Sequence, residues 1–279
     1  MTFKESINTF LKEGVSFPTA QAKALTKELL KHTLSATNQY DLQQTIALPN
    51  NTLGIEYIKA LFKLNSHIKP YTITRKGSNY HDNALSQTFS SATAIRHTID
   101  TEELNHLHLQ VPSVAFDVMQ KEYKKSFPIY PNDFSLLLRY RLLNETKESL
   151  CDYADVSEEL ANRIFNRRNE FVTFEQFCEL LKTKELTYAR ISRALLHILL
   201  KCKKSDINDI SYARVLGFHT DSTEVMTEIK KCSQIPLVTK LANFEHPMLE
   251  RDIQASHIYH SVITDKYKTT FQNEYEHHA

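Results

Sequence analysis

Three groups of polar side chains in the first hundred residues have the chemistry to hold a nucleotide. An amide pair follows a proline, an arginine ends a β-rich segment, and two hydroxyls and an arginine open a helical pattern. In chain order these residues are Asn50, Asn51, Arg75, Ser91, Thr93 and Arg96. Amides hydrogen-bond to a base or ribose edge, a guanidinium pairs with phosphate oxygens, and a hydroxylated helix start holds further oxygens. Together they indicate a nucleotide site.

Each group also has an ordinary structural interpretation. Asn is a favoured turn and helix-capping residue, so the pair at 50 and 51 could serve only to start a helix. Arg75 could be a solvated residue at a strand end, and Ser91 could simply cap a helix. Both interpretations stay open for every group.

The elements that must position these residues follow from periodicity and from turn residues. Helical patterns run from about residue 2 to Gly14, from Pro18 to about residue 32, and from about 52 to 64. The alternating stretch 68–75 predicts a strand, with Pro70 at its start or on a sheet edge. Since ligands of α/β folds bind outside the carboxyl ends of strands, this strand would place Arg75 at such a position.

From residue 100 onward the pattern is mainly helical. Capping-box spacing occurs at 155–158 and at 173–176, each ahead of a helical stripe. The stretch 187–204 predicts one long helix, and 248–259 predicts another. Between them, 214–218 and 236–238 predict strands on either side of a helix over 222–232, which would form a small βαβ unit. The tail from residue 272 is expected to fray.

Positive charge gathers in one part of the chain. Residues 161–204 hold ten lysines and arginines against four acidic residues, although the whole chain has a net charge of only +1. The candidates for contact with an RNA backbone are Arg163, Arg167, Arg168, Arg190, Arg193, Lys201 and Lys204. Such cations supply salt-dependent affinity for phosphates. The alternative is a solvated helix face, which is the commoner role of a charged stripe.

Composition limits the classes of protein that remain. At 279 residues with 41% apolar and 24% charged side chains, the chain is typical of a globular protein. No apolar run is long enough to span a bilayer, and the charged N-terminus is unlike a signal peptide, so we expect a cytoplasmic protein. The four cysteines are widely spaced and are expected to be reduced. We expect no metal site, because His257 and His260 have no partner ligands nearby in the sequence.

A series of short motifs extends over nearly the whole chain. They are PNNTLG at 49–54, KPYT at 69–72 followed by Arg75, YHD at 80–82, SATAIR at 91–96, LLKTK at 180–184, YARVLG at 212–217, PLVTKL at 236–241 and ASHIY at 255–259. In this order they resemble the motifs of the bacterial tRNA(Met) cytidine acetate ligase family. The ordered set is far more specific than any one motif.

The resemblance implies a helix-dominated α/β protein that uses ATP, with Mg²⁺, to acetylate the wobble cytidine of elongator tRNA(Met). It implies an incomplete Rossmann-like nucleotidyltransferase domain over 1–100, followed by a mostly helical tRNA-binding domain over 101–279. By analogy, Asn50 or Asn51, with Arg75, would contact ATP, and the 91–96 group would complete the phosphate end. Acetate would be the second substrate.

One departure from the family pattern bears on catalysis. The family's nucleotidyltransferase half carries a His-x-Gly-His signature, and this signature does not occur in the sequence; His106-Leu107-His108 lacks its glycine. We therefore expect no catalytic residue within this chain, and a separate chain could supply the missing portion. The alternatives are a non-catalytic RNA-binding module and an inactive fragment.

Overall fold

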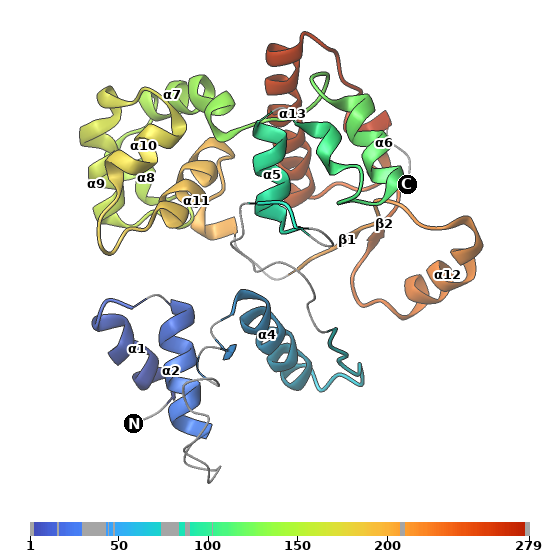
Figure 1. The fold of residues 1–279 in the computed structure, drawn as a ribbon, viewed down its shortest axis with the longest axis horizontal. Coiled ribbons are helices and arrows are strands. Elements are labelled where there is room, and N and C mark those ends of the chain that lie inside the picture. The colour runs from blue at the N-terminus through green and yellow to red at the C-terminus, as the bar shows by residue number, and fades with distance from the viewer. Residues whose placement is uncertain are drawn as a thin grey trace. The chain divides into compact units, whose positions relative to one another are not determined.

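The computed structural model describes residues 3–15, 17–29, 43, 45, 46, 48–73, 84–86, 90–101, 103–206 and 210–276. The chain forms two compact units, 1–76 and 77–279. Figure 1 shows that helices make up most of both. The fold is therefore helix-dominated α/β, as the sequence predicts. No helix among the described residues has the length and apolar character that crossing a bilayer requires.

In the first unit, α1 (Phe3–Lys12) and α2 (Phe17–Leu29) pack against each other. The contact buries small residues of α2, among them Ala20 and Ala24. The chain leaves α1 through Gly14, whose φ of +82° is a left-handed conformation that favours glycine. The predicted end of the first helix is confirmed.

Helix α4 (Pro49–Lys63), also in this unit, begins about three residues before the predicted start. Proline is favoured in the first turn because it has no N–H to leave unpaired there. Asn50 and Asn51 are therefore the second and third residues of a helix, not part of a loop before one. None of the fifteen residues of α4 is buried.

The strand predicted over 68–75 is wrong where the structure describes it. Residues 68–73 carry no strand assignment, and Arg75 lies outside the described residues. Alternation and β-branched side chains favour an extended chain, but a strand also needs a hydrogen-bonded neighbour. No such neighbour is present among the described residues.

The second unit consists mainly of helices. Their bounds are α5 (Ala92–Asp100), α6 (Ser113–Glu122), α7 (Ser135–Leu143), α8 (Lys147–Cys151), α9 (Glu158–Arg167), α10 (Phe174–Leu181), α11 (Tyr188–Leu199), α12 (Thr223–Cys232) and α13 (Pro247–Tyr267). Helices α7 to α11 surround the largest core, with Phe174, Phe177 and Leu195 almost fully buried. Their apolar faces are what the helical periodicity predicts.

The predicted βαβ unit is confirmed, although its strands are shorter than expected. The strands β1 (Ala213–Arg214) and β2 (Leu237–Val238) pair in parallel, and α12 lies between them in the chain. Figure 1 shows α12 standing away from the strands that it connects. Tyr212 and Val238 join Leu249 and Ile253 of α13 in a second, smaller core.

Several predicted element ends need correction. Helix α9 is capped by Ser157, whose hydroxyl accepts from the Leu160 N–H, and not by Asp155. Helix α11 ends at Leu199, five residues earlier than predicted, and α13 continues well past 259 to Tyr267. By contrast, Thr173 caps α10 as predicted. Capping residues two positions apart compete for one helix start, so spacing alone does not choose between Asp155 and Ser157.

The C-terminal tail was expected to fray from residue 272, and this is wrong for the described part. Glu274 accepts hydrogen bonds from Arg214 on β1 and Ser256 on α13. A salt bridge between distant segments leaves no periodic signal in the sequence.

Candidate functional site

In the amide pair in the first turn of α4, the Asn51 side chain is hydrogen-bonded to a described residue and the Asn50 side chain is not. Asn51 Nδ2 donates to the Thr45 carbonyl at 2.8 Å, and Thr52 Oγ1 donates to the Ile46 carbonyl at 3.1 Å. These bonds tie the helix start to the segment before it. Asn50 is exposed, and its amide has no hydrogen-bond partner among the described residues. The structural interpretation therefore applies to Asn51, while Asn50 is available to a ligand.

The backbone at the same place also presents N–H donors that have no acceptor within the helix. The first hydrogen bond of α4 runs from the Thr52 N–H to the Leu48 carbonyl. The N–H groups of Asn50 and Asn51 precede it and have no acceptor inside the helix. A helix start with free N–H groups attracts anions. The start of α4 can thus offer one side-chain amide and two backbone donors to a phosphorylated ligand.

In the second unit, Ser91 acts as the cap of α5. Its side chain is buried, and its Oγ accepts from the Ala94 N–H at 3.0 Å. Thr93 and Arg96 lie in the first and second turns, Thr93 half-buried and Arg96 exposed. Ser91 therefore forms the helix start, whereas the side chains of Thr93 and Arg96 remain candidates for direct contact.

Gln110, which no sequence pattern singles out, connects two serines that precede α5. Gln110 Nε2 donates to the Ser86 carbonyl at 3.0 Å, and Gln110 Oε1 accepts from Ser90 Oγ at 2.6 Å. Ser90 Oγ also accepts from the Ser86 N–H. A single glutamine twenty residues away has no spacing pattern, so only the fold reveals it. Arg75 and the motif at 80–82 lie outside the described residues, and the joint ATP site remains a prediction.

Three of the candidate RNA-contacting arginines hold helix ends together. Arg163 Nε and Arg167 Nη1 donate to the last two carbonyls of α10, those of Leu181 and Leu180, at 3.1 and 3.0 Å. Arg168 Nη1 donates to the Glu145 carbonyl, just beyond the end of α7, at 2.8 Å. Carbonyls at helix ends lack partners inside the helix, and charged donors satisfy them well. These guanidiniums therefore stabilise the helical core.

The basic face of α11 is partly neutralised. Arg193 forms two hydrogen bonds with Asp155, at 2.5 and 3.2 Å, and His197 Nδ1 lies 3.3 Å from the same carboxylate. The hydrogen bonds from Arg193 hold the pKa of the Asp155 carboxyl below its usual value. Arg190 is exposed, and its guanidinium has no hydrogen bond to any described residue. Arg190 is thus the freest cation of this helix.

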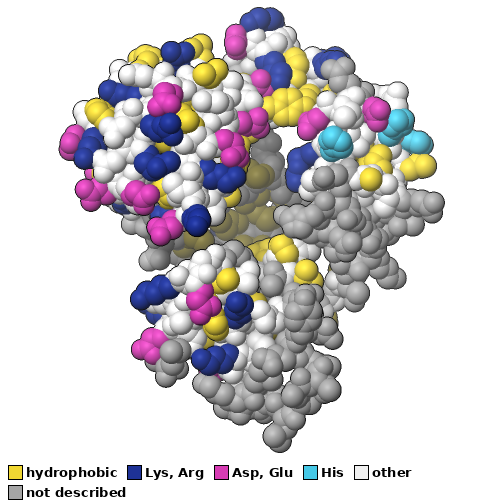
Figure 2. Space-filling model, turned by 60° about the vertical axis from the view of Figure 1, so that its left-hand side comes forward, with side chains coloured by type: hydrophobic (Ala, Val, Ile, Leu, Met, Phe, Trp, Pro, Cys, Tyr) yellow, Lys and Arg dark blue, Asp and Glu magenta, His cyan; other side chains and the backbone are white. Residues whose placement is uncertain are grey.

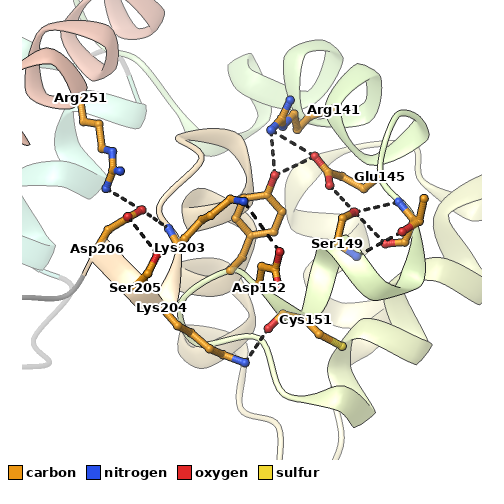
Figure 3. Close-up of polar contacts among 12 residues, drawn as sticks. Arg141, Glu145, Ser149, Cys151, Asp152, Lys203, Lys204, Ser205, Asp206 and Arg251 are labelled. Carbon is orange, nitrogen blue, oxygen red and sulfur yellow. Dashed lines mark hydrogen bonds and ion pairs between the residues drawn. The ribbon is translucent and has the colours of Figure 1, made fainter. Parts of the chain in front are cut away.

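Lys201 and Lys204 lie beyond the end of α11, so the predicted basic stripe does not continue along one helix. Lys201 has a left-handed φ of 57° and ends the helix. Lys204 turns back and donates to the Cys151 carbonyl at 2.6 Å (Figure 3). Near it lies an open cleft of about 490 Å³, lined by Lys147, Glu148, Cys151, Glu158 and Lys204.

A buried polar network that no sequence pattern indicates lies next to this cleft. The Glu145 carboxylate is almost fully buried and accepts from Tyr153 Oη at 2.8 Å and from Ser149 Oγ at 2.5 Å. Arg141 Nη2 lies 3.1 Å from the same carboxylate (Figure 3). Burial, with the Glu145 hydrogen bond, raises the pKa of the Tyr153 hydroxyl. The network joins the end of α7 to α8 and has a structural role.

The face of these helices that Figure 2 shows carries no continuous positive patch among its described residues. Figure 2 shows Lys and Arg side chains interspersed with acidic ones over helices α7 to α11. Ion pairs such as Lys203 with Asp152 and Arg167 with Glu170 account for part of this mixture. Contact with an RNA backbone would therefore rest on separate exposed cations, chiefly Arg190 and Lys201.

The histidine pair on α13 has an aromatic environment. His260 stacks on Phe271 at 4.7 Å, and its Nδ1 lies 2.9 Å from the Ser256 carbonyl. His257 also contacts the Phe271 ring. In the described parts of the chain, no three potential ligands gather as a metal site would require.

Comparison with protein families identifies one that spans the chain. The family model described as HIGH nucleotidyl transferase matches residues 1–275. Two similar relatives, each named tRNA(Met) cytidine acetate ligase, come from Alkaliphilus metalliredigens, with 34% identity over 92% of this chain, and from Clostridium tetani, with 35% over 93%. The chain spans about 65% of the length of both relatives.

Two crystal structures of Thermotoga maritima TmcAL share the fold. The apo form has a TM-score of 0.83 at 22% identity, and the form bound with alpha-thio ATP has a TM-score of 0.81 at 23% identity. Each match covers 99% of this chain and 69% of the solved chain.

Proposed function

Because this chain belongs to the HIGH nucleotidyl transferase family, we propose that it takes part in ATP-dependent acetylation of the wobble cytidine of elongator tRNA(Met), in the cytoplasm. The observation that carries the proposal is the identity of 34–35% over more than nine tenths of the chain with relatives named for this reaction. The family resemblance inferred from the motifs is confirmed. The activity itself rests on the names of those relatives.

The proposed reaction has two steps that balance without a redox partner. A carboxylate oxygen of acetate attacks the α-phosphorus of ATP, and the bond to pyrophosphate breaks. The exocyclic amine of cytidine then attacks the acetyl carbon, AMP leaves with the electron pair, and the amine loses a proton to give N⁴-acetylcytidine. The protein's part is to position the reactants and to neutralise phosphate charge, and Mg²⁺ would assist with the charge.

In the proposed site, Asn50 and the N–H groups at the start of α4 contact ATP. This assignment is supported by the exposed amide of Asn50, which has no hydrogen-bond partner among the described residues, and by the local bond that engages Asn51. Arg75, Thr93 and Arg96 would meet the phosphates. Ser91 contributes through the helix start that it caps.

The sequence contains no His-x-Gly-His, the signature that gives the family its name. We therefore propose that residues 1–279 alone do not form acetyl-adenylate and that the reaction needs the histidines of a part of the family fold outside these residues. A nucleotidyltransferase without them lacks the cations or donors that they would place on the phosphates.

The test is a reconstitution. Purified chain, ATP, labelled acetate and tRNA are incubated alone, or with the part of the Clostridium tetani relative that this chain does not cover. N⁴-acetylcytidine is measured by mass spectrometry of tRNA digests. N⁴-acetylcytidine is expected only when the chain and the added part of the relative are both present. The added part without the chain is the control. Product from residues 1–279 alone would contradict the dependence on a partner, and absence of product in a confirmed complex would contradict the proposed function.

A second candidate function is RNA binding without catalysis by the helical part. It is favoured by the exposed side chains of Arg190 and Lys201, which have no hydrogen-bond partner among the described residues. Removing both should weaken tRNA binding and make the dependence of log K on log salt less steep, by roughly 0.7–0.9 for each phosphate that is no longer neutralised. Arg139→Ala, an exposed arginine on α7, is the control. Binding that does not depend on salt would exclude this candidate.

A further inference from the structure

One glutamine connects residues that precede α5 with residues that follow it. Gln110 Nε2 donates to the Ser86 carbonyl at 3.0 Å, and Gln110 Oε1 accepts from Ser90 Oγ at 2.6 Å. Ser90 Oγ in turn accepts from the Ser86 N–H at 2.9 Å. These three hydrogen bonds form a closed ring, and Ser90 directly precedes Ser91, the cap of α5. The Gln110 amide therefore restrains the backbone immediately before the helix.

Gln110 is itself held against α5. Its N–H donates to the Leu107 carbonyl at 2.9 Å, and Leu107 is the last residue of the 3₁₀ turn η2 (Leu104–Leu107), which packs on α5. Leu107 is fully buried, and Ala94 and Thr98 of α5 are also buried. Because η2 packs on α5 and the amide of Gln110 returns to the residue before the cap, Gln110 fixes that residue relative to the body of the helix.

The part of α5 nearest to this ring is its first turn. Ser91 has φ of −70° and ψ of 154°, and its Oγ accepts from the third N–H of the helix. The N–H groups of Ala92 and Thr93 come before it and have no acceptor within the helix. Ala92 is exposed, and so is Arg96 one turn further on. A ligand outside the helix can therefore reach two backbone donors and a guanidinium.

The direction of these donors decides how well they hold an anion. A hydrogen bond weakens steeply when the angle at its hydrogen falls below about 120°, so the first turn must keep its orientation to be effective. Ser90 lies outside the helix, and its side-chain bonds restrict the backbone that leads into the turn. A donor that is already oriented loses less entropy when the ligand binds. Loss of the ring should therefore reduce ligand affinity.

These contacts require the two functional groups of a glutamine side chain. The Ser86 carbonyl needs a donor and the Ser90 hydroxyl needs an acceptor, and one amide supplies both. A glutamate would turn a carboxylate oxygen towards the Ser86 carbonyl, and a methionine of similar length would offer no donor. Substitutions at this position can thus remove the hydrogen bonds while keeping much of the side-chain volume.

We infer that Gln110 is a positioning residue for the phosphate chain of a nucleotide. Through Ser86 and Ser90 it orients the N–H groups of Ala92 and Thr93 towards the phosphate oxygens, without contacting the ligand itself. The inference rests on the proposed function in one respect: the start of α5 is the phosphate end of the ATP site.

The test measures binding to residues 1–279 separately from catalysis. The probe is inorganic tripolyphosphate, titrated by calorimetry at low ionic strength, where charge screening is weak. Gln110→Met should weaken binding about fivefold or more. Ser90→Ala removes one of the same hydrogen bonds, so the effects of the two substitutions should be less than additive in the double variant. The matched control is Gln120→Met at an exposed position on α6, which should bind like wild type.

Hydrogen exchange separates orientation of the turn from general stability. Tripolyphosphate should protect the amides of residues 92 and 93 in the wild type and protect them less in Gln110→Met. With the added part of the Clostridium tetani relative present, Gln110→Met should raise the KM for ATP several-fold and leave kcat nearly unchanged. Circular dichroism checks that each variant is folded at the temperature of titration, and Gln110→Glu replaces Gln110→Met if that variant unfolds.

Four results would overturn the inference. They are no binding of tripolyphosphate, binding that Gln110→Met leaves unchanged, equal weakening by Gln120→Met, and binding that is insensitive to Arg96→Ala, which would place the ligand away from α5. Absence of acetylcytidine in the mixture, with tripolyphosphate binding that still depends on Gln110, would contradict the proposed function and leave the role of Gln110 standing.

Discussion

Similar polar residues of this chain differ in whether their side chains already form hydrogen bonds within the protein. Asn50 and Asn51 are adjacent and chemically identical, but only Asn51 has its amide bound to a backbone carbonyl of a described residue. Among the basic residues, the Arg193 guanidinium is hydrogen-bonded to Asp155, whereas the Arg190 guanidinium has no hydrogen bond to a described residue and only a longer-range attraction to Asp155. The availability of a side chain therefore decides which candidates can act on a ligand.

The amide pair gives a direct prediction at this scale. Asn50→Ala should reduce ATP affinity about fivefold, the effect of losing one hydrogen bond of about 1 kcal/mol, without changing stability. Asn51→Ala should instead destabilise the start of α4 and affect ATP only slightly. Calorimetry with ATP, in the presence of any partner needed for binding, and urea unfolding separate the two effects. Equal loss of ATP affinity in both variants would refute the assignment.

The Asp155 carboxyl gives a prediction about pH. Its pKa is lowered in the folded protein by the hydrogen bonds from Arg193, so the ionised form stabilises the fold. That contribution is present above the unfolded pKa of about 3.9 and is lost as the pH falls through the lower folded pKa. Asp155→Asn should therefore be less stable than wild type near pH 7, and the difference should shrink below about pH 4.

Urea unfolding from pH 7 to pH 3 measures this difference. Asp117→Asn, at an exposed position on α6, is the control and should show no such trend. A gap between Asp155→Asn and wild type that widens in acid would have the wrong sign for this mechanism.

At the scale of elements, arginines connect the ends of neighbouring helices. Arg163 and Arg167 reach from α9 to the end of α10, and Arg168 reaches to the end of α7. The sequence places these three residues in its basic cluster, but their donors are directed to carbonyls of the same unit. The charge count suggests RNA contact for these arginines, whereas their hydrogen bonds give them a role in holding helix ends together.

Arg168→Ala should lower the free energy of unfolding by about 1.5–3 kcal/mol, because the carbonyls of Leu142 and Glu145 lose a charged donor. Its effect on tRNA affinity should be small once the folded fraction is considered. The matched control is Arg139→Ala on α7, which should be nearly neutral for stability. If Arg168→Ala weakened tRNA binding strongly at unchanged stability, the arginine would belong to the RNA surface.

At the scale of the whole molecule, the compact units divide at 76/77, while the proposed functional division falls at 100/101. Helix α5 lies between the two boundaries. It packs on the 3₁₀ turn η2 (Leu104–Leu107), and Ala94 and Thr98 of α5 are buried, as are Leu104 and Leu107. Residues after 100 thus depend on residues before it.

Two fragments test where the stable domain begins. Residues 77–279 should melt cooperatively, and residues 101–279 should melt at least about 5 °C lower, because exposing two buried leucines costs several kcal/mol. Calorimetry of both fragments measures the difference. Equal melting temperatures would show that α5 is dispensable and would support a domain boundary at 100/101.

The sequence by itself determined the family, the helix-dominated α/β class, the reduced state expected of the cysteines and the βαβ unit near the C-terminus. These features depend on local patterns: motif order, 3.6-residue periodicity, and turn residues between β-forming runs. It also drew attention to the Pro-Asn-Asn start of α4, since proline and asparagine act on the nearest few backbone groups.

Only the tertiary structure decided which polar groups are free. The engagement of Asn51 by Thr45, of Asp155 by Arg193 and of the α10 carbonyls by Arg163 depends on contacts between residues brought together by folding. The stretch 68–73 is a second case in which local sequence does not decide the structure. Its residues favour a strand, but a strand exists only where another backbone completes its hydrogen bonds, and that partner is a property of the assembly and not of the segment.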